Sequence, residues 1–197
     1  MFAYCGNNPV MYSDPTGCYH KNIFPIYADN GFHYILNQHD QSIANLPLGE
    51  STVGKMGCGI VAIYNALLSM RDYTTFEEVY SYFADNPSRL ADNGKSGISI
   101  NEIAAYFRSK GYYVLVVNAH FPETFAFCSR YSDANIMLYT YGTFTNSSGH
   151  FIEYEWTGTH YVGRNIKGGT DWFTDPLLYG LEDDKYFVRG VFICKWD

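Results

Sequence analysis

A cysteine set between two glycines, directly before an apolar segment, constrains the fold of this chain more than any other feature. The run Gly57-Cys58-Gly59 precedes residues 60–68, where apolar side chains recur at helical spacing, at Ile60, Ile63, Tyr64, Leu67 and Leu68. This spacing predicts an amphipathic or buried helix. Cys58 would lie in its first turn, where unpaired backbone N–H groups and the positive end of the helix dipole favour a thiolate. The pattern indicates either a nucleophile or the small buried residue that a free cysteine more often is.

A histidine far along the chain is positioned to act as the base that such a nucleophile needs. Apolar and polar side chains alternate over residues 150–156, a Thr-Gly turn follows, and residues 160–166 form a second strand-like run. This pattern predicts a β-hairpin. His150 would begin the first strand and Asn165 would lie near the end of the second, so the hairpin would bring them together. Cys58, His150 and Asn165 are then a candidate set of nucleophile, base and orienting residue.

These segments resemble the papain-like cysteine peptidases, and most closely the double-glycine-leader (bacteriocin-processing) peptidase-like family. The resemblance covers residues 48–178 and rests on the Gly-Cys-Gly that opens a helix, on Gly149-His150-Phe151 and on the polar residue Asn165. It implies a papain-like fold, with the cysteine on a helical layer and the histidine on a sheet that faces it. Two positions depart from the family. Ile60 replaces the usual proline, and Thr52 replaces the glutamine whose amide donates to the oxyanion.

The orienting residue and the oxyanion donor stay open at this point. Asp175, which precedes a proline as in many family members, and Asp171 are alternatives to Asn165. The Cys58 backbone N–H is one expected oxyanion donor. The candidates for the second donor are polar side chains upstream of it, namely Thr52, Ser51, Gln38 and Gln41. An oxyanion donor is worth about 10²–10³ in rate, so the missing glutamine bears on catalytic strength.

The first seventeen residues resemble the end of an Rhs (YD-repeat) core. Asn7-Asn8-Pro9 and Asp14-Pro15-Thr16-Gly17 are turn clusters that bracket a short apolar stretch, as at the close of the conserved Rhs shell. The segment lacks the basic and apolar regions of a signal peptide. The resemblance implies a polymorphic-toxin effector domain, exported as part of a larger protein, acting in a target cell and opposed by a cognate immunity protein. An ordinary N-terminal tail is the alternative.

Charge and cysteine usage narrow the choice of partners. The net charge is −7 and no basic run occurs, so we expect no nucleic-acid partner. No apolar stretch is long enough to span a bilayer. The five cysteines are an odd number without close pairs, which fits free thiols better than a disulfide framework. Cys18, His20, His33 and His39 lack metal-ligand spacing, so we expect neither a metal nor a cofactor.

Helix signals dominate the first half of the chain and strand signals the second. Capping-box spacings at Thr75–Glu78 and Ser99–Glu102 predict helix starts, and Gly111 predicts a helix end. Strands are predicted over residues 112–118, 136–141, 151–156, 161–166 and 186–196. This order predicts an α+β fold with a mostly antiparallel sheet. We expect three parts, an Rhs-like tail (1–17), a lead-in segment (18–47) and a catalytic domain (48–197).

The pattern and the resemblances together predict a cysteine-dependent acyl-transfer enzyme, a peptidase or amidase with a protein or peptide substrate. Deamidase or transglutaminase chemistry would use the same residues. A recognition module that kept the fold and lost the activity is an alternative from a different class. A nucleotide or NAD hydrolase is disfavoured, because no Gly-rich phosphate loop is present.

Overall fold

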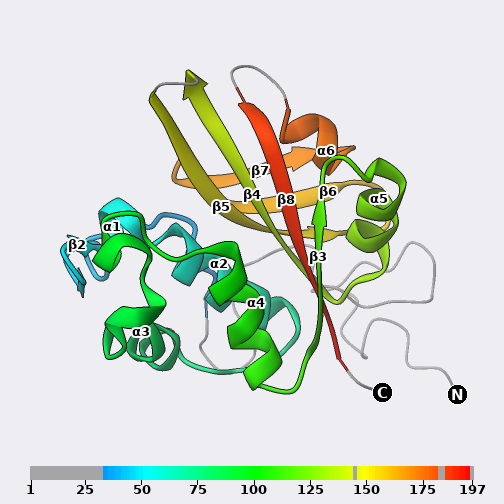
Figure 1. Ribbon diagram of the computed structural model, residues 1–197. Helices are drawn as coiled ribbons and strands as arrows, with labels where there is room; N and C mark the ends of the chain where they lie inside the picture. The colour runs from blue at the N-terminus through cyan, green and yellow to red at the C-terminus, as the bar shows by residue number, and fades with distance from the viewer. Residues whose placement is uncertain (1–32, 144–145, 182–184, 196–197) are drawn as a thin grey trace, which may run out of the picture.

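The computed structural model describes residues 33–143, 146–181 and 185–195. These residues form an α+β fold on one six-stranded sheet (Figure 1). In spatial order its strands are β3 (Tyr113–Asn118), β8 (Lys185–Cys194), β4 (Ala134–Thr143), β5 (Asn146–Trp156), β6 (Tyr161–Ile166) and β7 (Gly169–Phe173). All neighbouring strands in this sheet are antiparallel, so the predicted α+β class with an antiparallel sheet is confirmed.

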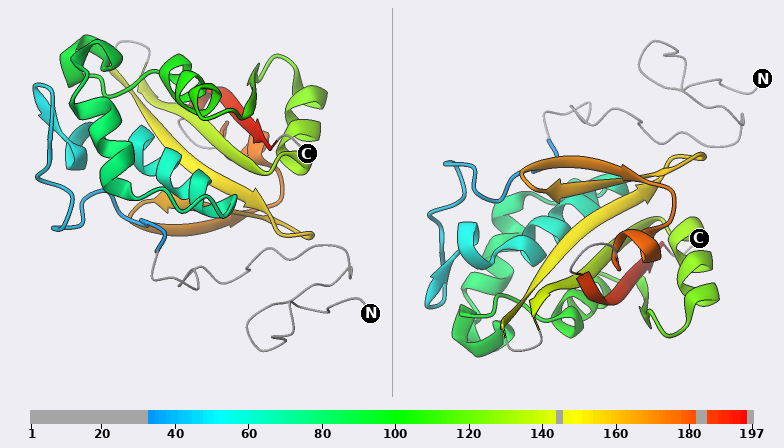
Figure 2. Two further views of the ribbon diagram at one scale, coloured as in Figure 1. Left: turned by 90° about the horizontal axis from the view of Figure 1, so that it is seen from below. Right: turned by 90° about the horizontal axis from the view of Figure 1, so that it is seen from above.

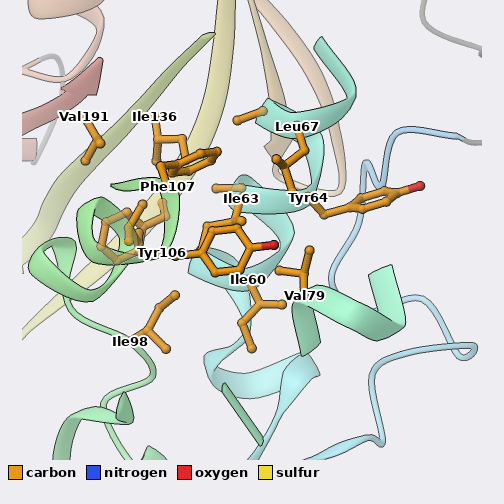
Figure 3. Close-up of a cluster of buried hydrophobic side chains, with 14 of the residues drawn as sticks. Ile60, Ile63, Tyr64, Leu67, Val79, Ile98, Tyr106, Phe107, Ile136 and Val191 are labelled. Carbon is orange, nitrogen blue, oxygen red and sulfur yellow. The ribbon is translucent and has the colours of Figure 1, made fainter. Parts of the chain in front are cut away.

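The helix that begins at Cys58 is the centre of the layer on one face of the sheet. This helix, α2 (Cys58–Ser69), is buried from Gly59 to Leu68, as expected for a helix that is apolar all round. α3 (Phe76–Ala84) and α4 (Ile100–Ser109) belong to the same core, which also includes Ile136 and Val191 from the sheet (Figure 3). Packing on all sides therefore fixes the start of α2, where Cys58 lies.

Both predicted helix starts on this face are confirmed. The Thr75 hydroxyl accepts from the Glu78 N–H (3.2 Å), and the Glu78 carboxylate accepts from the Thr75 N–H (2.8 Å). The Ser99 hydroxyl accepts from the Glu102 N–H at the start of α4. Gly111 follows α4 with a φ of 87°, a left-handed conformation that glycine adopts at low cost.

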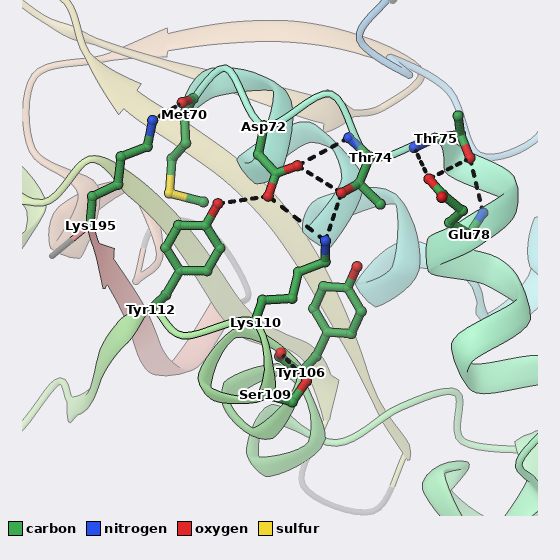
Figure 4. A network of polar contacts seen from close by, with 10 residues as sticks. All are labelled: Met70, Asp72, Thr74, Thr75, Glu78, Tyr106, Ser109, Lys110, Tyr112 and Lys195. Carbon is green, nitrogen blue, oxygen red and sulfur yellow. Dashed lines mark hydrogen bonds and ion pairs between the residues drawn. The ribbon is translucent and has the colours of Figure 1, made fainter.

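Asp72 joins the loop before α3 to the segment after α4 (Figure 4). Its carboxylate accepts hydrogen bonds of 2.7 Å from the hydroxyls of Tyr112 and Thr74, and it lies 3.8 Å from the Lys110 ammonium. Burial opposes the charge of Asp72, but these contacts outweigh it and lower the pKa of the carboxyl. The network ties the end of α4 to the loop between α2 and α3.

Two further helices, α5 (Pro122–Tyr131) and α6 (Pro176–Tyr179), lie on the opposite face of the sheet (Figure 2). Phe125 of α5 meets Phe192 of β8 edge to face, with ring centroids 5.1 Å apart. Tyr179 of α6 stacks on Phe173 of β7 at 4.4 Å. The sheet is therefore covered on both faces, and successive residues of its central strands enter two different cores.

The segment before the helical layer is bound to it by side-chain and backbone contacts. It includes a short hairpin of β1 (Pro47–Leu48) and β2 (Ser51–Thr52), and α1 (Val53–Met56) follows. Upstream, the backbone N–H and C=O of Ile35 both bond to the buried Asn65 amide at 2.9 Å. The Asn65 side chain thus pairs with the lead-in backbone as a neighbouring strand would. Two short 3₁₀ turns, η2 (Pro87–Arg89) and η3 (Ala91–Gly94), connect α3 to α4.

Four features differ from the sequence-based expectation. β5 begins at Asn146, so His150 lies inside the strand and does not begin it. The other three are β7, α5 and α6, for which no strand or helix is expected from the sequence. In α5, Phe127 and Tyr131 are exposed, so the sequence of this helix does not show a distinct polar face. β7 begins with Gly169, and glycine is more typical of turns than of strands.

The Rhs-like run of residues 1–17 lies outside the described residues. Across the ranges that are described, no helix has the length and apolarity needed to cross a membrane. In the same ranges, no three His, Cys, Asp or Glu side chains gather as metal ligands would.

Candidate active site

Cys58 is the first residue of α2, and close packing requires both glycines beside it. A Cβ atom on Gly57 would lie 2.5 Å from the Val53 carbonyl oxygen. One on Gly59 would lie 2.5 Å from Ile98 Cγ1 and 3.4 Å from a ring carbon of Phe151. The first two separations are far below van der Waals contact. The start of α2 can therefore pack this closely against Ile98, in the segment before α4, because residue 59 has no side chain.

The thiol of Cys58 lies against the backbone of β5. The backbone N–H groups of Phe151, Gly59 and Cys58 itself lie close enough to the sulfur to favour its charged form. Burial raises the pKa of the Cys58 thiol, and the three N–H groups offset that rise only in part. The net shift is opposite to the one expected from a helix start, so Cys58 rests as a thiol and needs a base.

His150 directly precedes Phe151, and one nitrogen of its ring is anchored. Nε2 lies 2.7 Å from the backbone carbonyl oxygen of Asn165. Since a carbonyl oxygen only accepts, Nε2 carries the proton and Nδ1 of the neutral ring is the free acceptor. Burial lowers the pKa of His150, the Asn165 carbonyl partly offsets this, and the charge of His39 lowers it further. A neutral imidazole of fixed tautomer thus belongs to the residue next to Phe151, whose N–H lies near the thiol.

Asn165 contacts His150 through its backbone because β6 bulges at this residue. Its φ is 65°, in the left-handed region that asparagine adopts more readily than most residues. The pairing of β6 with β7 shifts register between Arg164 and Ile166. The predicted proximity of His150 and Asn165 is confirmed. Asn165 makes this contact through its backbone carbonyl, because its side-chain amide bonds to Gln38.

The two alternative orienting residues have other partners. Asp175 caps α6 and accepts from the N–H groups of Leu177 (2.8 Å) and Leu178 (3.1 Å). Asp171 is exposed on β7 and accepts from the N–H of Trp172 at 2.8 Å. Among the described residues, neither carboxylate is hydrogen-bonded to His150.

The candidate oxyanion side chains are dispersed. Ser51 and Thr52 belong to the β1–β2 hairpin, and Gln41 is exposed in a turn. Gln38 is buried, and its Nε2 donates to the Gly54 carbonyl at 2.9 Å. The donors found at the thiol are backbone N–H groups, which fits the expected contribution from the start of the helix.

Tyr139 is a neighbour of His150 that the sequence analysis does not identify. It is the register partner of His150 across β4 and β5, and the two rings meet edge to face with centroids 5.8 Å apart. Burial raises the pKa of Tyr139, and the nearby Cys58 contributes to the same shift. Tyr139 therefore stays protonated beside His150. Its predicted strand was correct, but only the register reveals which residue of β5 it faces.

A buried charge cluster holds together the hairpin that carries the candidate base. Arg164 Nη1 lies 2.6 Å from Glu153 Oε2, and Nη2 lies 2.9 Å from Glu155 Oε1. All three side chains are buried, and the Tyr34 ring covers the guanidinium, with its centroid 3.8 Å from Cζ. The cluster joins β5 to β6 immediately before the Asn165 bulge.

One guanidinium serves two carboxylates in this cluster. Burial raises the pKa of Glu153, and the charge of Glu155 adds to that effect against the attraction of Arg164. The Ser69 hydroxyl of α2 donates to Glu153 at 2.7 Å. The alternation of apolar and polar residues over 150–156 includes both glutamates of the cluster. The polar positions of such a strand usually face water, whereas Glu153 and Glu155 are buried on the side of the helical layer.

The described residues include three kinds of group that nucleophilic catalysis uses. They are a thiol at a helix start, a neutral imidazole with one acceptor nitrogen, and backbone N–H groups near the sulfur. Protein-family models give no match to this sequence, and curated proteins give no match to it. The functional interpretation therefore rests on the geometry of Cys58, His150 and Asn165.

Proposed function

We propose that the chain is a cysteine-dependent acyl-transfer enzyme of papain-like fold, a peptidase or amidase that acts on a protein or peptide. The observation that carries the proposal is the position of the Cys58 thiol at the start of α2, near the backbone N–H of Phe151, because Phe151 directly follows His150. The anchored ring of His150 supports the same reading. A cysteine at a helix start and a histidine on an antiparallel sheet agree with the papain-like arrangement.

In this proposal Cys58 attacks the carbonyl carbon of the substrate. His150 accepts the thiol proton at Nδ1 as the S–C bond forms, and later gives it to the leaving amine. Backbone N–H groups at the start of α2 stabilise the oxyanion. Water resolves the acyl-enzyme in a peptidase, amidase or deamidase, and an amine does so in a transglutaminase. All of these reactions would use Cys58 as the nucleophile and His150 as the base.

We further propose that the chain acts as the effector of an Rhs-type polymorphic toxin. This part rests on the resemblance of residues 1–17 to the end of an Rhs core. It implies export within a larger protein, action in a target cell and a cognate immunity protein. The net charge of −7 favours a protein substrate over a nucleic acid.

A second candidate function is a recognition module of the same fold without activity. The raised pKa of the Cys58 thiol favours it, because a buried thiol that stays protonated is the state of a structural cysteine. The departures from the family at Ile60 and Thr52 point the same way. The two candidates differ in whether His150 controls the reactivity of Cys58.

The deciding experiment compares growth of cells that express the wild-type chain, Cys58→Ala, His150→Ala or Cys128→Ala in the cytosol. The last variant is a matched control, because Cys128 is also a partly buried free thiol. We expect the first two substitutions to abolish toxicity and the third to leave it unchanged. Equal toxicity of all four would contradict the enzyme proposal.

A chemical readout covers the case in which no variant is toxic. Iodoacetamide should alkylate Cys58 of the purified wild-type chain faster than Cys58 of His150→Ala, since the imidazole assists removal of the thiol proton. Equal rates in the two proteins would favour the inactive module.

A further inference from the structure

Gln38 is the point at which the segment before the helical layer touches both halves of the candidate site. Its side chain is 6% exposed, and its amide makes a hydrogen bond at each end. Nε2 donates to the Gly54 carbonyl at 2.9 Å, and Oε1 accepts from the Asn165 amide at 3.1 Å. The Gln38 backbone N–H also donates to Asn165 Oδ1 at 3.1 Å. Gln38 thus forms a closed pair of hydrogen bonds with Asn165 and a third bond to α1.

The two partners of Gln38 belong to different layers. Gly54 lies in α1, four residues before Cys58 on the helical side, and Asn165 is the bulged residue of β6 on the sheet side. Both backbone polar groups of Gly54 are hydrogen-bonded: its carbonyl accepts from Gln38, and its N–H donates to the Ala44 carbonyl at 2.9 Å. One side chain therefore links the segment that precedes the thiol to the residue whose carbonyl anchors the imidazole.

The Asn165 bulge needs such support. A left-handed backbone at a residue other than glycine persists only when its surroundings hold it. Two hydrogen bonds with Gln38 engage the side-chain amide of Asn165, and the Asn165 backbone carbonyl accepts from His150 Nε2. A change at Gln38 would be passed to His150 through a chain of two hydrogen-bonded contacts.

We infer that Gln38 is a positioning residue that fixes the tautomer and placement of His150 through Asn165 and ties them to the helix start that carries Cys58. This inference rests on the proposed function for its catalytic meaning. It differs from the oxyanion role considered above, because it requires no contact between the amide and a substrate. The amide is instead occupied between α1 and β6.

A double-mutant cycle tests the inference. The second-order rate of iodoacetamide alkylation at Cys58 is measured for the wild-type chain, Gln38→Met, His150→Ala and the double variant. Methionine has a similar volume to glutamine and removes both side-chain hydrogen bonds. We expect Gln38→Met to slow alkylation about tenfold or more when His150 is present, since small misplacements of a reacting group are costly. It should leave the rate unchanged when His150 is absent. Asn45→Leu, at an exposed amide in the turn of the same segment, is the matched control and should have no effect.

A spectroscopic readout separates this inference from the proposed function. The ¹⁵N chemical shifts of the His150 ring should report a single Nε2–H tautomer in the wild-type chain and a mixture in Gln38→Met. Equal slowing in both backgrounds, or an unchanged tautomer in Gln38→Met, would overturn the inference. If His150→Ala does not alter alkylation but Gln38→Met alters the tautomer, the proposed function fails and the positioning role stands. If Gln38→Met does not fold, Gln38→Glu is used, which keeps the acceptor for Asn165 and loses the donor to Gly54.

Discussion

The resting states of Cys58 and His150 follow from a competition between burial and hydrogen bonding at each group. Burial raises the pKa of the thiol and lowers that of the imidazole, and in neither case do the hydrogen bonds reverse the shift. Both changes favour the neutral pair over a thiolate–imidazolium pair. The sequence could predict the helix start that favours a thiolate, but not the burial that opposes it, because burial depends on the packing of β5 against α2.

The pH dependence of Cys58 alkylation should reveal this neutral pair. The His150-dependent rate should rise as the pH increases through a value below 6.5, the ordinary pKa of histidine, because the base must be unprotonated. It should rise again as the thiol ionises above its ordinary value of 9.0. The check is a pH–rate profile of the wild-type chain beside His150→Ala, which should lack the first rise. A full rate that persists into strong acid would instead indicate an ion pair.

Gly59 should be intolerant of even the smallest side chain. Gly59→Ala would place a methyl group 2.5 Å from Ile98 Cγ1, so α2 and the segment that carries Ile98 must move apart. We expect a loss of about 1–3 kcal/mol in the free energy of unfolding, measured by urea denaturation, and slower alkylation of Cys58. Gly169→Ala is the matched control, since its Cβ would meet only the Ile166 carbonyl oxygen, at 3.8 Å. A Gly59→Ala variant as stable as this control would contradict the packing argument.

At the scale of the element, the hairpin that carries His150 shows what alternation can predict and what it cannot. The strand over residues 161–166 matches β6 in full, and the antiparallel pairing that brings His150 to Asn165 follows from the same pattern. The bulge at Asn165 does not follow, because it is set by the Gln38 contacts and by the register with β7. The start of β5 was also missed, since Ser147, Ser148 and Gly149 are weak strand formers.

Asp175 should stabilise helix α6 and should not affect the reactivity of Cys58. Asp175→Ala removes the N-cap of α6, which accepts from the N–H groups of Leu177 and Leu178, and should lower the free energy of unfolding by about 0.5–2 kcal/mol. The rate of Cys58 alkylation should stay at the wild-type value, measured on the folded variant. Asp171→Ala should leave both quantities near wild type, because Asp171 is exposed. Slower alkylation in either variant would restore that residue as a candidate orienting group.

For the whole molecule, two long-range connections join the lead-in segment to the core. Asn65 of α2 binds the backbone of Ile35, and Tyr34 covers Arg164 in the charge cluster. Both connections link positions that are far apart in sequence, and no local pattern in residues 33–46 marks them. The fold class was predictable from the order of helix and strand signals. The way this segment completes the site was not.

The charge cluster should contribute to global stability through the pairing of buried groups. Arg164→Met leaves Glu153 and Glu155 buried without their cation, and we expect a loss of about 3–5 kcal/mol in the free energy of unfolding, measured by guanidinium denaturation. Lys95→Met is the comparison. It removes the exposed pair between Lys95 and Glu50 and should cost at most about 1 kcal/mol. Similar losses in the two variants would mean that Arg164 is less important than its burial indicates.

The group that holds the His150 ring is a backbone carbonyl oxygen, which is present whatever the side chain of that residue is. Every amino acid at position 165 would supply that oxygen, so a mutational scan that removes side chains one at a time cannot delete it. Substitutions reach it only by changing the path of the chain. In an alignment of related sequences, position 165 would show which residues permit the bulge. It would not mark a catalytic side chain. The third member of this candidate site is therefore a backbone carbonyl whose position depends on the path of the chain. A genetic screen would detect its displacement as mutations at Gln38 or Asn165.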